Sequence, residues 1–278
     1  MSSLAALVLL SPVARAATPS QWESRLQGDA IVLLGEVHDN PIQHHLRLEI
    51  LTRALTAGWR PAIAMEQFDR EHQADIEAAR KERPLDANYL IEKAAPVPGK
   101  PGTGWNWDYY RPYVVLALEH QLPLLAANLS RSDAERIVEQ GYGAVFDADT
   151  IHLLGLDREP ASRLAAQERE IDVGHCHAMP RDLLPAMARA QLARDVFMAS
   201  VVRGHSADGF VLLAGDGHVR RDIGVPAWLK APFIARVFTV GFLERGEPAA
   251  AHSPFDAVVV TDQASRPDPC APLRKHRS

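Results

Sequence analysis

The sequence predicts an α/β fold, with a largely parallel central sheet flanked by helices and a helical, lid-like subregion. Short apolar runs with β-branched residues alternate along the chain with helical stretches, and this alternation is typical of parallel sheets. The chain has 278 residues, of which 47% are hydrophobic, so it is long enough to bury one well-developed core. Its net charge of −5 comes without a long run of either sign, so a nucleic-acid partner is not expected.

About six strands are expected, each a short apolar run of the kind that forms a buried strand. In chain order they fall at residues 30–34, 61–65, 121–127, 209–214, 236–241 and 257–260.

The clearest helix signal follows the first of these strands. Asn40 followed by Pro41 is typical of an N-cap and a first helical position, and the helix is expected to reach Gly58. Its apolar residues at helical spacing are Ile42, Leu46, Ile50 and Leu51.

Further helices are expected at residues 112–120 and in two Ala- and Arg-rich stretches, residues 70–93 and 180–202. The two stretches belong to the predicted lid elements, at about residues 70–110 and 180–202. After the first stretch, residues 94–104 are rich in Gly and Pro and predict a loop.

The N-terminus predicts an export signal over residues 1–16. An apolar run at residues 4–10 precedes Ala14-Arg15-Ala16, a small-x-small pattern that predicts cleavage before Ala17, although no positive charge precedes the run. We see no lipid-anchor Cys at the cleavage site and no transmembrane segment, so a periplasmic location is expected. The α/β domain is expected over residues 17–265, with a loose C-terminal tail at residues 266–278.

Export would place Cys176 and Cys270 in an oxidising compartment. They can pair there if the fold brings their Cα atoms within about 7 Å, which the sequence leaves open. A zinc site with His175 and His177 has no familiar ligand spacing.

Two predicted strands end in the same motif, Gly-x-x-His with an acidic residue after the Gly. These motifs run from Gly35 to His38, including Glu36, and from Gly215 to His218. Because the carboxyl ends of parallel strands share one edge, both histidines should face a common site, joined by Glu66 from the end of a third strand.

This group of Glu36, His38, Glu66 and His218 has two chemical interpretations. The side chains could bind a divalent metal (Mn, Zn or Co), or they could divide acid and base roles around a bound water. A serine hydrolase, a phosphate loop and a dinucleotide fingerprint are not indicated by the sequence.

Residues 104–112 concentrate two Trp and two Tyr in a chain that is only 6% aromatic. The segment is interpreted either as a packed corner or as a platform for a flat apolar ligand, with a tyrosine oxygen on ferric iron and Arg111 beside it. Arg194 is open to two interpretations as well: a structural ion pair with Asp195, or a group that meets an acidic ligand in the crevice.

The ordered set of motifs resembles the ChaN-type haem-binding uptake family, which is similar in fold to the Tiki, TraB and erythromycin esterase group. The resemblance is carried by residues 33–41 with His44-His45, 65–69, 105–112, 127–131, 175–180, 191–199 and 217–226.

This resemblance implies an exported haem-binding protein of bacterial iron uptake. ChaN-type proteins hold two haems face to face in a dimer, with each iron on a tyrosine and in contact with a histidine of the other subunit. Here Tyr110 is the first choice for the ligand, with Tyr113 and Tyr142 as alternatives. Arg111, His175, His177 and Arg194 complete the candidate haem-binding residues.

The partners that the resemblance implies are haem, a second copy of the chain, and components of a haem receptor or transporter. Family members are often lipoproteins, so the missing anchor Cys is a departure from the pattern. The alternative function is a metal-dependent hydrolase of the Tiki type, which uses Glu36, His38, Glu66 and His218; haem uptake itself requires no catalysis.

Overall fold

A computed structural model of the chain describes residues 22–95, 104–246, 254–268 and 270–271. The predicted signal peptide, most of the predicted loop at 94–104, and residues 272–278 of the predicted tail lie outside the described residues. Among the described residues, no helix is long and apolar enough to cross a membrane.

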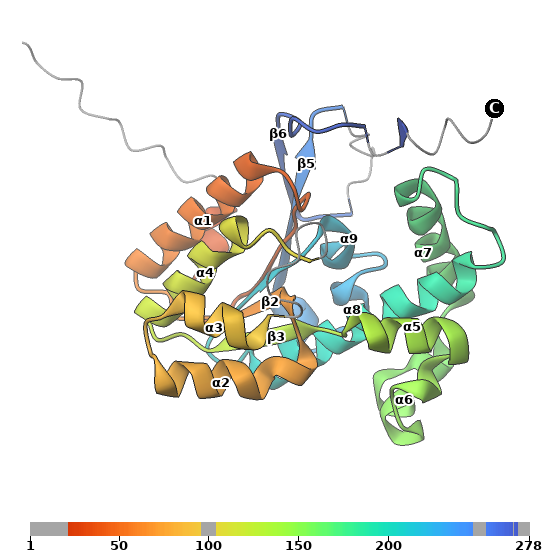
Figure 1. The fold of residues 1–278 in the computed structure, drawn as a ribbon, viewed down its shortest axis with the longest axis horizontal. Helices are drawn as coiled ribbons and strands as arrows, with labels where there is room; N and C mark the ends of the chain where they lie inside the picture. Colours follow the sequence, from red (N-terminus) through yellow and green to blue (C-terminus); the bar gives the residue numbers. More distant parts are fainter. Residues whose placement is uncertain (1–21, 96–103, 247–253, 269, 272–278) are drawn as a thin grey trace, which may run out of the picture.

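The centre of the molecule is a six-stranded sheet with the order β3-β2-β4-β1-β5-β6, and every neighbouring pair of strands is parallel (Figure 1). The predicted α/β class with a largely parallel sheet is therefore confirmed. The strands are β1 (Ile31–Leu34), β2 (Ala62–Asp69), β3 (Leu124–Asn128), β4 (Phe210–Leu213), β5 (Val237–Glu244) and β6 (Ala257–Thr261).

Alternating side chains of the central strands supply two separate cores, as the two-residue period of a strand requires. In β1, Val32 and Leu34 pack into one core, and Ile31 and Leu33 pack into the other. Strands buried on both faces read as continuous apolar runs, which is why these segments show no alternation in the sequence.

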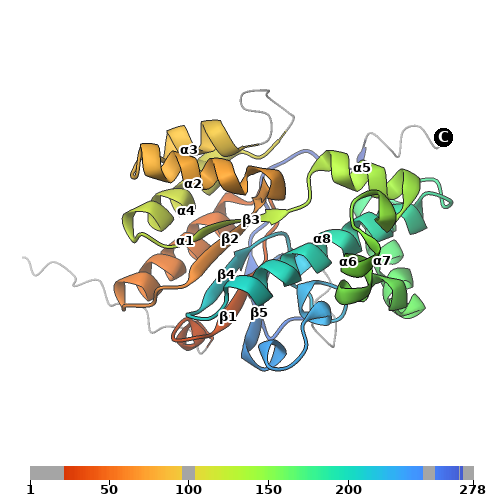
Figure 2. The same cartoon turned by 90° about the horizontal axis from the view of Figure 1, so that it is seen from below.

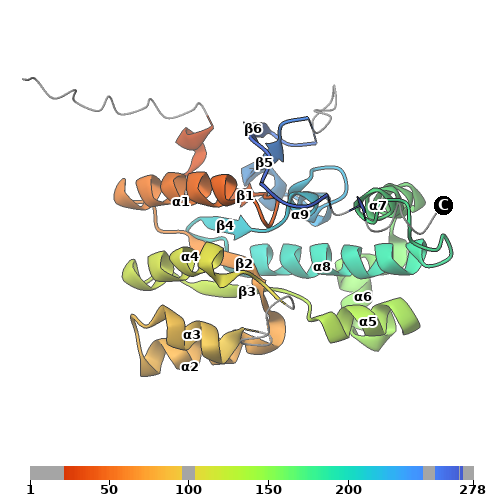
Figure 3. The same cartoon turned by 45° about the horizontal axis from the view of Figure 1, so that its top comes forward.

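Four helices cover the first face of the sheet: α1 (Pro41–Thr56), α2 (Gln73–Glu82), α3 (Ala87–Ala94) and α4 (Trp107–Glu119) (Figure 3). The second half of α8 (Leu184–His205) covers the opposite face and contacts β3, and its Met198 and Val202 belong to the core on that face (Figure 2). The short α9 (Asp216–Val219) follows β4.

The first half of α8 extends beyond the sheet and carries a separate helical region, the α5–α7 region. It consists of α5 (Arg131–Gln140), the 3-10 helix η3 (Tyr142–Ala144), α6 (Ala148–Leu154) and α7 (Ala161–Gly174). These elements project to one side of the sheet (Figure 1) and have their own small core around Leu129, Ile137 and Phe146. Of the two expected lid elements, residues 70–110 form α2 and α3, which pack beside α4 and β3, and residues 180–202 form most of α8, which contacts α5 and α7.

Two details of the predicted helices are corrected by the structure. Helix α4 begins at Trp107 rather than at 112, because Asn106 caps it by accepting a hydrogen bond from the Asp108 N–H, and Pro112 lies inside the helix. In α1, the predicted apolar residue Ile42 is 42% exposed. The polar residues Gln43, His44 and Arg47 are buried in its place.

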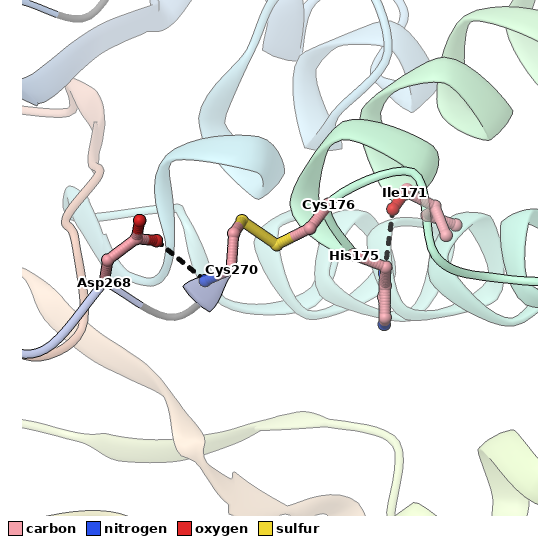
Figure 4. Close-up of a disulfide and its surroundings, with 5 residues drawn as sticks. All are labelled: Ile171, His175, Cys176, Asp268 and Cys270. Carbon is pink, nitrogen blue, oxygen red and sulfur yellow. Dashed lines mark hydrogen bonds between the residues drawn. A yellow bond between two sulfur atoms is a disulfide. The ribbon is translucent and has the colours of Figure 1, made fainter. Parts of the chain in front are cut away.

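The C-terminal segment is attached to the domain at two points. Arg266 forms ion pairs with Asp39 and Glu244. Cys270 forms a disulfide with Cys176 at the turn after α7, with the two Cα atoms 5.5 Å apart (Figure 4). The sequence left the pairing of Cys176 and Cys270 open. The segment predicted as a loose tail is held to the domain at Arg266 and at Cys270.

Candidate functional site

The two Gly-x-x-His motifs lie against each other at the carboxyl edge of the sheet. A Cβ atom on Gly35 would lie 2.1 Å from Oδ1 of Asp216, and one on Gly215 would lie 2.9 Å from Cε1 of His38. Each motif therefore requires glycine so that its neighbour can approach closely. The sequence predicted that the ends of these strands would lie together, and the two motifs do lie side by side.

Glu36 is the centre of the first polar group, and its side chain is fully buried. One carboxylate oxygen accepts hydrogen bonds from Nδ1 of His38 (2.9 Å) and from the Tyr110 hydroxyl (2.6 Å). The other oxygen faces the guanidinium of Arg47, which is also fully buried and donates to the carbonyls of Leu34 and Gly35. Burial alone would raise the pKa of Glu36, but Arg47 and the His38 hydrogen bond hold it below its usual value.

His218 is the centre of the second polar group. Its Nδ1 lies 2.6 Å from Oδ1 of Asp195, and its Nε2 lies 3.4 Å from Oε1 of Glu66. Glu66 also accepts a hydrogen bond of 2.8 Å from the Gly215 N–H. Burial alone would lower the pKa of His218, but the two carboxylates outweigh it and raise that pKa to about 10. The two carboxylates therefore favour the protonated form of His218.

His38 differs from the rest of the site because its side chain is 45% exposed. Its ring meets the Trp105 ring edge to face, with the centroids 4.8 Å apart. The neighbouring His44 is buried, stacks on Tyr109 with 4.6 Å between centroids, and bonds through Nε2 to the carbonyl of His38. Burial lowers the pKa of His44, so a neutral, structural role fits it.

Two of the three tyrosines considered as iron ligands lie in the interior. Tyr110 and Tyr113 are both 0% exposed, and their hydroxyls donate to Glu36 and to the His44 carbonyl. Burial and the Glu36 carboxylate raise the pKa of Tyr110 far above its usual value, which opposes formation of a phenolate. With the side chains packed in this way, a haem iron can reach neither the hydroxyl of Tyr110, the first choice from the sequence, nor that of Tyr113.

Tyr142 has a different environment. It is partly exposed on η3, beside the small core of the α5–α7 region, and its hydroxyl donates to Glu159 at 3.1 Å. Burial and that carboxylate raise its pKa above the usual value.

The remaining candidate haem residues lie in three separate parts of the structure. Arg111 is exposed and donates to Asn88. His175 and His177 are exposed on the turn after α7, beside the disulfide, where Nδ1 of His175 bonds to the Ile171 carbonyl (Figure 4). Arg194 lies near the second polar group and donates to Gln191. Asp195 pairs with His218, so the ion pair with Arg194, one of the two interpretations of that residue, is not the contact that Asp195 makes.

Three residues of the site were not identified as site residues from the sequence: Arg47, Asp195 and Gln191, whose amide nitrogen lies 3.0 Å from Nε2 of His218. One signal was available for Arg47. It shares a helical stripe with Leu51 and Leu55, so a charged residue occupies a core position of α1.

The histidines and carboxylates of the two polar groups pair with one another and do not converge on one point. In the part of the chain that the structure describes, no group of three or more His, Cys, Asp and Glu side chains is arranged to hold a metal ion. The two histidines are instead engaged with carboxylates through Nδ1. The observed geometry is that of two hydrogen-bonded acid–base pairs.

Comparison with known proteins identifies the family. The profile of the haem-binding uptake family ChaN, of the Tiki superfamily, matches residues 22–229. The chain belongs to the ChaN family. A search of curated proteins gave no match.

Several solved structures align with most of this ChaN-family protein, and the first of them shares its fold. ChaN of Campylobacter jejuni, in a structure titled as cofacial haem binding, has a TM-score of 0.60 and 21% identity, covering 79% of this chain and 83% of that one. The type III effector HopBA1 has a TM-score of 0.43 and 12% identity over 84% of this chain and 88% of that one. Erythromycin esterase EreC has a TM-score of 0.40 and 12% identity over 82% and 74%.

Proposed function

We propose that this ChaN-family protein binds haem in the periplasm as part of bacterial haem or iron uptake. The observation that carries the proposal is the family match over residues 22–229. The similarity to Campylobacter jejuni ChaN, described as binding cofacial haem, supports the same ligand class here.

The periplasmic location is supported by two independent features. The sequence predicts an export signal before Ala17. The disulfide between Cys176 and Cys270 is a bond that persists in oxidising compartments and is rare in the bacterial cytosol.

Among the three tyrosines from the sequence, Tyr142 fits an iron ligand best. Haem needs an apolar surface for its porphyrin and a ligand atom that the iron can reach. Tyr142 is partly exposed, and like Val145, Ile151 and Leu154 it packs against the small core of the α5–α7 region. Bound haem would supply a ferric iron that the Tyr142 oxygen can hold. The hydroxyl would then lose the proton that it now donates to Glu159.

The α5–α7 region is also the part of the surface that suits a second copy of the chain. Of the large apolar side chains exposed on the described residues, Leu153, Val173 and Leu183 lie on α6, on α7 and just before α8. His175 and His177 are exposed on the adjoining turn, with Nδ1 bonded to the Ile171 carbonyl and to Asp172 respectively, and we propose that a haem held by the partner lies against this turn. We therefore propose that haem is bound by a dimer formed through this region.

Haem titration of the protein from Ala17 onward tests this proposal. We expect saturable binding with a tyrosinate-type ferric spectrum, and we expect Tyr142→Phe to weaken binding at least 10-fold and remove the tyrosinate bands. The matched control is Tyr89→Phe, because the Tyr89 hydroxyl also donates to a glutamate, Glu82, but lies on α3. This control should bind haem as the unchanged protein does.

Two results would overturn parts of the proposal. The absence of saturable haem binding would reject haem uptake. A spectrum altered by Tyr110→Phe and unaffected by Tyr142→Phe would return the iron to Tyr110. Sedimentation of the haem-loaded protein tests the dimer. A monomer that carries one haem would contradict this part of the proposal.

A further inference from the structure

The end of the chain forms a strap between the sheet and α7. The strap, residues 262–268 with Cys270, follows β6 and reaches the turn after α7 (Figure 1). Near its start, the buried carboxylate of Glu244 on β5 accepts hydrogen bonds of 2.7 and 2.8 Å from the guanidinium of Arg266. Near its end, the disulfide joins Cys270 to Cys176 (Figure 4). The strap therefore couples the turn after α7 to the far side of the sheet.

The turn that carries Cys176 has an unusual backbone. Cys176 and His177 have φ angles of 57° and 55°, in the left-handed region that residues with a side chain disfavour. Helix α7 ends here with the two hydrogen bonds of a Schellman motif, from the Cys176 N–H to the Val173 carbonyl (2.9 Å) and from the His177 N–H to the Asp172 carbonyl (2.8 Å). The left-handed position of this motif is usually Gly, and here it is Cys176.

Such a backbone conformation persists where surrounding contacts hold it in place. The disulfide is a covalent contact of this kind, because it ties the first left-handed residue, Cys176, to the strap. Cleavage of the bond would therefore leave the turn free to adopt the backbone angles that Cys and His prefer.

The bond lies where a thiol can reach it in the folded protein. Cys176 and Cys270 are each partly exposed, and their neighbours His175, His177 and Asp268 are exposed. A disulfide is reduced by attack of a thiolate on one of its sulfur atoms, so access contributes to the rate. A disulfide inside an apolar core would be protected until the protein unfolds.

We propose that the disulfide between Cys176 and Cys270 is a redox site that a protein dithiol reduces in the folded molecule, and that its reduction weakens haem binding. The effect on haem rests on the proposed function, in which a haem held by the partner lies against this turn. The exchange of thiol and disulfide does not depend on haem.

The exchange balances with the dithiol as reductant. One thiolate of the dithiol attacks a sulfur of the bond, forms a mixed disulfide and releases the other cysteine as a thiolate, which takes a proton. The second thiol of the reductant then displaces the remaining cysteine, which takes a proton as well. The dithiol is oxidised to a disulfide by two electrons, and Cys176 and Cys270 are reduced to thiols.

Reduction should change the turn and the strap while the body of α7 stays in place. Two other contacts hold this helix. Glu170 pairs with Arg220 at 2.8 Å, and the guanidinium of Arg163 lies over the Trp228 ring, 4.6 Å from its centroid. The change is therefore local, and it falls on the turn that carries the two exposed histidines.

The first test is reduction of the haem-free protein from Ala17 onward by dithiothreitol, without denaturant. We expect alkylation of both cysteines, measured by mass spectrometry, and an unchanged circular dichroism spectrum after the reagent is removed. Hydrogen exchange should become about 10-fold or more faster at residues 175–178 and 262–268, and it should stay unchanged in α1.

Haem titration of two variants without the disulfide tests the effect on binding, and it avoids a reductant that would act on the iron. Cys176→Ser combined with Cys270→Ser should bind haem about 5-fold or more weakly than the unchanged protein. Cys176→Gly combined with Cys270→Ser is the matched control. Because glycine adopts the left-handed conformation readily, this variant should bind haem within about twofold of the unchanged protein.

Three outcomes would overturn the proposal. A bond that dithiothreitol reduces only in urea would reject the redox site. Haem binding by both variants as tight as that of the unchanged protein would reject the effect on haem, and equal weakening in both variants would reject the turn as its cause. If the unchanged protein binds no haem, the proposed function fails, while alkylation and hydrogen exchange still decide whether the redox site exists.

Discussion

The guanidinium of Arg47 pairs with the carboxylate of Glu36, and both side chains are fully buried at the point where β1 meets α1. Glu36 also receives the His38 ring and the Tyr110 hydroxyl. This one ion pair thus connects the first Gly-x-x-His motif to α1 and α4, and its loss would leave a buried charge without a partner.

Arg47→Met is expected to destabilise the protein by about 3–5 kcal/mol, because Glu36 then remains buried without its cation. Urea unfolding measures this loss. Arg53→Met is the matched control from the same helix: Arg53 forms exposed ion pairs with Glu23 and Glu49, so about 1 kcal/mol or less should be lost. If Arg47→Met does not fold, Arg47→Lys, which keeps the charge, should fold with an intermediate stability. Equal losses in Arg47→Met and Arg53→Met would show that the buried pair has no special role.

The protein is expected to lose stability as the pH rises from 7 to 10. The folded-state pKa of His218 is raised to about 10 by Glu66 and Asp195, against about 6.5 in an unfolded chain. The stabilisation is therefore fully present below about pH 6.5 and is lost as the pH rises through the folded pKa. One proton contributes a slope of up to about 1.4 kcal/mol per pH unit. Urea midpoints across this range, with the His218 ring followed by NMR, provide the measurement; a flat profile with His218 neutral at pH 8 would contradict the assignment.

Loss of the disulfide should cost about 2–4 kcal/mol, because Cys176 and Cys270 close a loop with a sequence separation of 94 residues. Cys270→Ser and reduction of the unchanged protein should give the same decrease in the free energy of unfolding. Reductant added to Cys270→Ser serves as the control and should cause no further change. Free thiols detected in the exported, folded protein would show that the bond does not form.

Local sequence patterns predicted most of the fold. All six predicted strands are present with shifted ends, because a short apolar run between breakers is buried whichever neighbour it pairs with. Helix α4 was placed too late because the proline was a stronger signal than the cap at Asn106. The exposed Ile42 shows that helical spacing alone does not determine which face of α1 turns inward.

The sequence predicted that His38, Glu66 and His218 would meet, because the predicted strands end at or shortly before these residues and the carboxyl ends of parallel strands share an edge. In the structure β2 continues to Asp69, so Glu66 lies within the strand. Three pairings depend on the packing of the whole fold: Arg47 with Glu36, Asp195 with His218, and Cys270 with Cys176. The tertiary structure also placed Tyr110 in the interior and Tyr142 near the surface. The physical reason is that periodicity fixes which way a side chain points within its own element. The packing of elements distant in the sequence decides which group it meets and whether water or a ligand can reach it.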